Sequence, residues 1–210
     1  MARKMVLMSL LAPLATFALL ALPLQARAAN DDEVLKDMEA AKMTLTKAVD
    51  TAEKASKGKA VAVHAKMEGK TGTIFVYCMV SGKNMEVPVE IKTGTAGKIT
   101  EATAKNEKAE HVTKGADILK KLDDDKFTLN RAIEAAELSS KGKAISVKPK
   151  IDGDKLDLMV KCCAAEKWYN VTVDAKTGKV TKTDELKAEK KHEDKKTGTQ
   201  KTDTTGGKKP

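Results

Sequence analysis

Apolar residues in the chain first follow a helical spacing and then a strand-like one. Leu45, Ala48, Val49 and Ala52 are three or four positions apart, which places their side chains on one face of a helix. After Gly58, apolar residues recur at every second position through three segments, as in half-buried strands. This pattern predicts one helix, ended by Gly58, followed by three strands.

The same pattern occurs a second time, 84 residues further along. Thr44–Val49 corresponds to Thr128–Ile133, and Cys78 corresponds to Cys162. Threonine is a favourable N-cap, so both helices are expected to begin after it. The glycine that ends the second helix is Gly142. The chain therefore contains two copies of one structural unit.

The fold class that we predict is α+β: two repeats, each a helix packed on a small antiparallel β-sheet of about three strands. Glu33–Met38 and Asp117–Leu122 are expected to form a short helix before each copy. The lysine-rich C-terminal residues have too few large apolar side chains to fold alone. The expected parts are a signal peptide (1–28), a first repeat (29–101), a polar linker (102–116), a second repeat (117–183) and a disordered tail (184–210).

The N-terminus has the pattern of a secretory signal peptide. Arg3 and Lys4 precede the apolar stretch Met5–Leu24, and small residues follow at the −3 and −1 positions of a cleavage site between Ala28 and Ala29. The alternative is an uncleaved membrane anchor. We expect cleavage, export to the periplasm or the extracellular medium, and no stable membrane insertion afterwards.

Charge and composition argue against nucleic acid as a partner. The 210 residues include 39 Lys+Arg and 30 Asp+Glu, which gives a net charge of +9. The lysines are dispersed and form no dense stripe that could follow phosphates. Aromatic residues are only 3% of the chain, too few for base-stacking platforms.

The sequence predicts no catalytic residues, no metal ligands and no cofactor, and therefore no enzyme. No two of His64, His111 and His192 have the spacing of a helical zinc site, and we expect all three to be solvated. A nucleophile elbow, a phosphate-binding loop and a dinucleotide fingerprint are all absent from the sequence.

The three cysteines allow several arrangements. Cys78 and Cys162 occupy equivalent positions on the expected core face, and Cys163 points to the opposite face. Separate cores would leave Cys78 and Cys162 reduced and buried, which is the arrangement that we expect. A Cys78–Cys162 disulfide would need the two sheets to meet, with Cα atoms within about 7 Å, and a Cys162–Cys163 ring is the third arrangement.

The second copy ends in a characteristic segment. Val171–Val180 reads Val-Thr-Val-Asp-Ala-Lys-Thr-Gly-Lys-Val. Within it, Asp174, Thr177 and Gly178 are expected to form the tight turn that closes the repeat, since Asp and Thr bond local backbone groups and Gly accepts a positive φ. The first copy carries a three-residue insertion there, because its offset falls from 84 to 81.

Together with Thr-Leu-x-x-Ala-Ile-x-x-Ala from Thr128 and Lys-Gly-Lys-Ala-x-x-Val from Lys141, this segment resembles the PepSY domain. PepSY domains occur in propeptides of bacterial metallopeptidases and in many exported bacterial proteins. The resemblance implies an exported, non-catalytic module that binds an unidentified exported protein or peptide and regulates or inhibits a secreted peptidase. The alternative is a structural or stress-related cell-envelope protein with no peptidase link.

Overall fold

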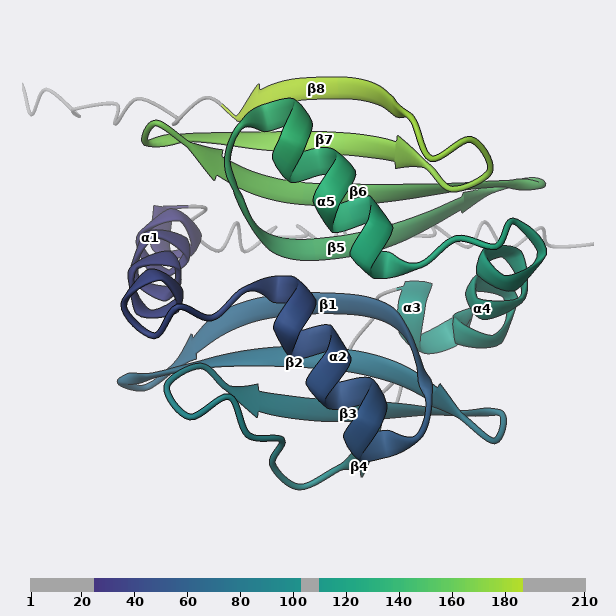
Figure 1. Ribbon diagram of the computed structural model, residues 1–210, viewed down its shortest axis with the longest axis horizontal. Coiled ribbons are helices and arrows are strands. Elements are labelled where there is room, and N and C mark those ends of the chain that lie inside the picture. The colour runs from purple at the N-terminus through teal and green to yellow at the C-terminus, as the bar shows by residue number, and fades with distance from the viewer. Residues whose placement is uncertain (1–24, 103–109, 187–210) are drawn as a thin grey trace, which may run out of the picture.

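The computed structural model describes residues 25–102 and 110–186 (Figure 1). A single antiparallel sheet forms its centre, with strand order β4-β3-β2-β1-β5-β6-β7-β8. Helices α2 (Leu45–Ser56) and α5 (Leu129–Ser140) lie side by side on one face of the sheet (Figure 1). The strands are β1 (Lys59–Glu68), β2 (Thr71–Val80), β3 (Lys83–Glu90), β4 (Thr100–Glu101), β5 (Lys143–Asp152), β6 (Lys155–Ala164), β7 (Lys167–Asp174) and β8 (Val180–Leu186).

The prediction of two repeats, each with its own small sheet of about three strands, is wrong. The repeats share one eight-stranded sheet, because β1 pairs with β5 at Val63↔Val147 and His64↔Ser146. Each first strand would otherwise be an edge with unpaired N–H and C=O groups, and the pairing satisfies some of these groups on both strands. The buried side chains form one continuous core, so the expectation of separate cores is wrong as well.

Helices α2 and α5 begin where the sequence predicts. The Thr44 hydroxyl accepts a hydrogen bond from the Lys47 N–H at 3.2 Å, and the Thr128 hydroxyl accepts one from the Arg131 N–H at 3.3 Å. The side chains buried on each helix are those of the predicted apolar stripe. The helical parts of the repeat pattern are therefore confirmed.

The helix ends differ from the prediction in one respect. The left-handed residue at the end of α5 is Lys141 (φ 54°), and Gly142 is not in that region. Glycine is needed at 142 for another reason: a Cβ atom there would lie 2.3 Å from the carbonyl oxygen of Cys163. Gly58 in the first repeat has the same role against the carbonyl oxygen of Met79, at 2.6 Å.

Two further helices precede α2 and α5, as expected, and contact the opposite repeat. They are α1 (Gln25–Ala40) and α4 (Gly115–Asp124), the latter following the short α3 (Glu110–Thr113). Asp32 of α1 accepts a hydrogen bond from Trp168 Nε1 of β7 at 2.9 Å. In return, Asn84 of β3 donates to the backbone carbonyl of His111 in α3. These reciprocal contacts tie the two repeats into one unit.

The predicted leader, apart from residues 25–28, and the predicted tail beyond residue 186 lie outside the described residues. The predicted cleavage position, between Ala28 and Ala29, falls within α1. Within residues 25–102 and 110–186, no helix is both long and apolar enough to cross a membrane.

A candidate binding pocket between the two repeats

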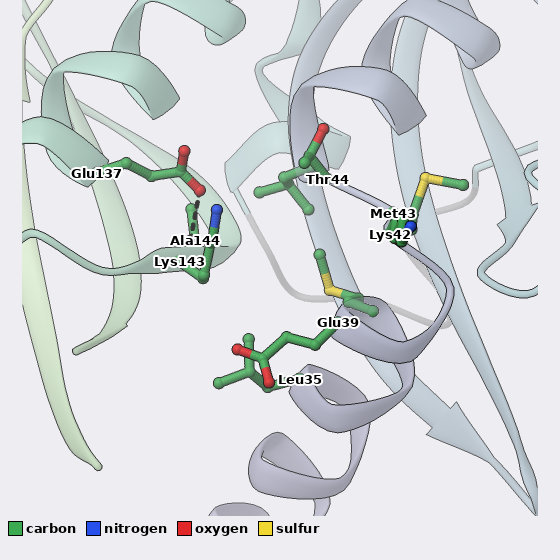
Figure 2. A pocket seen from close by; sticks show the side chains of 10 residues that line it. Leu35, Glu39, Lys42, Met43, Thr44, Glu137, Lys143 and Ala144 are labelled. Carbon is green, nitrogen blue, oxygen red and sulfur yellow. Dashed lines mark hydrogen bonds between the residues drawn. The ribbon is translucent and has the colours of Figure 1, made fainter. Parts of the chain in front are cut away.

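A pocket of about 300 Å³ lies where α1 ends and α2 begins, opposite α5 and β5 (Figure 2). Both repeats contribute to its walls. The lining residues are Leu35, Met38, Glu39, Lys42, Met43, Thr44 and Leu45 from the first repeat, and Glu137, Lys143 and Ala144 from the second.

The first wall is set by the tight connection between α1 and α2. The N–H of Met43 donates to the carbonyl of Met38 at 2.8 Å, which closes the end of α1. Lys42 adopts a left-handed conformation (φ 52°), which turns the chain sharply, and Thr44 then caps α2. This short connection places the last turn of α1 beside the first residue of α2, Leu45.

The second wall is fixed by a hydrogen bond between α5 and β5. The backbone N–H of Ala144 donates to Glu137 Oε1 at 2.9 Å (Figure 2). The first repeat contains the same bond, from the Ala60 N–H to Glu53 Oε1 at 2.8 Å. Glu137 is therefore held by the fold through one oxygen atom, and the small side chain of Ala144 leaves space in front of it.

The pocket has an apolar floor and a charged rim. Met38, Leu45 and Ala144 are buried, and Leu35 and Met43 are half-buried. The unbranched Met side chains can adapt to different occupants. The rim carries charges of both signs, because Glu39, Lys42 and Lys143 are exposed and Glu137 is half-buried.

This arrangement is suited to holding an apolar side chain whose neighbours are polar or charged. The described residues contain no group of His, Cys, Asp and Glu that could hold a metal ion. The sequence did not identify the pocket, since its walls come from segments about 100 positions apart, such as Leu35 and Glu137. The one available signal was the glutamate that recurs as Glu53 and Glu137 before the helix end of each repeat.

The two equivalent cysteines lie far from each other in the shared sheet. Cys78 and Cys162 are fully buried free thiols. They belong to β2 and β6, and β1 and β5 run between them. Three strand spacings of about 4.8 Å amount to about 14 Å, which is well beyond disulfide reach. Burial raises the pKa of each thiol to about 11, so both are protonated at neutral pH.

Alkylation should distinguish the three thiols. Cys163 is half-buried, and its pKa is raised first by burial and then by the charges of Asp32 and Glu39. We expect the native protein to be labelled slowly, at Cys163 alone, because the thiolate is the reactive form. Intact-mass measurement after unfolding without reductant should show three labels. A single label under those conditions, on Cys163 alone, would show that Cys78 and Cys162 are bridged.

Asp174, Thr177 and Gly178 form the turn between β7 and β8. Asp174 Oδ1 accepts from the Thr177 N–H at 2.8 Å and from its hydroxyl at 2.9 Å, and Gly178 has a positive φ of 69°. Burial acts to raise the pKa of Asp174, but these bonds and the Lys155 ammonium together lower it. The stabilisation is complete above the usual carboxyl pKa and is lost as the pH falls through the lowered value. None of the three turn residues lines the pocket.

The structure corrects the expectation that the histidines are solvated. His111 is only 7% exposed, and the centroid of its ring lies 4.3 Å from the centroid of the Tyr77 ring. His64 is half-buried and stacks on Phe75 at 5.5 Å. The polar sequence around His111 gave no sign of burial, which results from α3 lying against the opposite repeat. His192 lies outside the described residues.

Comparisons with known proteins do not identify the chain. No family model matches it, and none of the curated proteins matches it. Among solved structures, it is similar to the crystal structure of a putative lipoprotein from Clostridium difficile 630, at 15% sequence identity and a TM-score of 0.38. The similarity covers 64% of this chain and 86% of that chain. At this level of similarity, it supports no conclusion about function.

Proposed function

We propose that this protein is an exported, non-catalytic binding module of PepSY-like type. Its pocket between the repeats holds an apolar side chain of a protein or peptide partner. The observation that carries the proposal is the apolar floor of Met38, Leu45 and Ala144 beneath a rim of both charge signs. The leader-like N-terminus supports export, to the periplasm or the extracellular medium.

The size and surroundings of the pocket favour a polypeptide over a free small molecule. A volume of about 300 Å³ is at the lower end of the range for small-molecule sites and suits one or two side chains. The exposed groups of Glu39, Lys42 and Lys143 can contact the polar residues that flank an inserted side chain. Because the rim contains both acids and bases, it does not require a strongly charged partner.

Regulation of a secreted peptidase is the more specific role that the resemblance suggests. Adding the purified protein to exported metallopeptidases and measuring peptide hydrolysis tests that role. Inhibition that disappears when the pocket is filled would support it. If hydrolysis is unchanged while the protein still binds a partner through the pocket, the protein is a binding module with no peptidase link.

A pair of equivalent positions in the two repeats allows a matched test of the pocket. Leu35 lines it, whereas Leu119 is the corresponding half-buried residue of α4 and lies outside it. Leu35→Trp should fill the pocket, and Leu119→Trp should place the same bulk elsewhere. Proteins captured from the exported fraction by the wild type and by Leu119→Trp, but not by Leu35→Trp, would support the proposal. Equal capture by both variants, with unchanged circular dichroism, would contradict it.

A further inference from the structure

The two ends of the sheet differ in length and exposure. β4, at one end, contains only Thr100 and Glu101. β8, at the other end, runs from Val180 to Leu186, and all but its first residue are exposed. No other strand of the described part of the chain pairs with its outer side. An exposed edge of this length can act as a template for another strand.

Two of the three charged residues of β8 are arranged symmetrically about one residue. Thr183 lies at the centre of the sequence Val-Thr-Lys-Thr-Asp-Glu-Leu, with Lys182 before it and Asp184 after it. Lys182 Nζ and Asp184 Oδ2 are 2.7 Å apart, and both side chains are well exposed. Two β8 strands that pair antiparallel about an axis through Thr183 would place Lys182 of each copy opposite Asp184 of the other.

The same charges reject the neighbouring registers. Sliding one β8 strand along the other by two residues is the smallest shift that keeps each side chain on its own face of the sheet. One such shift puts Lys182 opposite Lys182 of the second copy, and the other puts Asp184 opposite Asp184. Like charges directly opposite each other destabilise a strand pair, whereas opposite charges stabilise it. Charged side chains that usually protect an edge therefore select one register here.

We propose that two copies of this chain associate through β8 into a symmetric dimer with one continuous sheet. The contact is isologous, since the same residues are used by both copies. It involves none of the pocket residues, so it is independent of the proposed binding function. The pairing of β8 with β7 is irregular next to Thr181, which limits the regular contact to the residues around Thr183. The dimer is accordingly weak and depends on protein concentration.

The register can be tested by cross-linking in a Cys163→Ser background, which removes the half-buried thiol. In Thr183→Cys, the two introduced thiols lie on the symmetry axis, where directly opposed Cα atoms are about 4.5–5.5 Å apart. That distance permits a disulfide, so mild oxidation should give a covalent dimer. Thr181→Cys is the matched control, because this exposed threonine of the same strand lies off the symmetry axis, at the irregularity of β8, and should cross-link poorly. Equal cross-linking of both variants would overturn the register.

The role of charge can be tested by sedimentation over a range of protein concentrations. Lys182→Asp places two carboxylates opposite each other at both symmetry-related positions and should raise the dimer dissociation constant about tenfold or more. Adding Asp184→Lys reverses both signs and should restore association. A wild type that stays monomeric at the highest attainable concentration, or a double variant as weak as Lys182→Asp, would overturn the proposal. A heterologous strand partner would instead leave the wild type monomeric and bind it one to one.

Discussion

Ile133→Asp should prevent the chain from folding. The Ile133 side chain is fully buried on the face of α5 that packs against the sheet. An unpaired carboxylate in that position has no group to replace its hydration, which makes its burial very unfavourable. We expect loss of the cooperative thermal transition, followed by circular dichroism. Because both repeats share one core, no separate transition of the first repeat should remain.

Milder substitutions provide the controls for this result. Ile133→Ala should lower the free energy of unfolding by about 2–5 kcal/mol, and Val49→Ala, at the equivalent position of α2, should lower it less because fewer atoms are removed. Leu138 lies on the same helix but is 82% exposed, so Leu138→Asp should leave the thermal transition nearly unchanged. An Ile133→Asp protein that melts like the wild type would refute the packing of α5 on the sheet.

Gly142→Ala should be the most damaging conservative substitution at a turn. A Cβ atom at 142 would lie 2.3 Å from the carbonyl oxygen and 2.7 Å from the carbonyl carbon of Cys163. The backbone cannot move away freely, because the adjacent Lys143 is paired with Cys163 in the β5–β6 ladder. We expect a loss of about 3 kcal/mol in the free energy of unfolding, at the upper end of the usual cost of overpacking, measured by urea denaturation.

Gly97→Ala is the control for this steric argument. Its Cβ would lie 3.2 Å from the Cγ atom of Pro88, and Gly97 is exposed, so a small adjustment of a side chain accommodates the added methyl group. We expect a change within about 1 kcal/mol. If Gly97→Ala and Gly142→Ala lower the free energy of unfolding by similar amounts, the conformational freedom of the glycine backbone, and not the close contact with β6, explains the glycine at 142.

The features that the sequence determined are those that depend on nearby residues. Thr44 and Thr128 cap their helices because each hydroxyl reaches an N–H three residues ahead. The stripe that includes Ile133 is set by the helical period alone. The repeat itself was evident because the same local interactions are encoded twice, 84 residues apart. The Asp174 turn belongs to the same group, since the bonds that Asp174 accepts from Thr177 and Gly178 span only three and four residues.

Only the tertiary structure decided how these elements combine. Alternation of apolar residues marks β1 and β5 as strands. The same alternating pattern is expected for an edge strand and for two strands that pair with each other through Val63 and Val147. The role of Gly142 depends in the same way on a carbonyl group in another strand. The pocket exists because that pairing brings Leu35 and Glu137 to one place. Periodicity indicates which face of a helix or strand is buried. Contacts between distant segments arise only when strand edges pair and buried faces pack together in the folded protein.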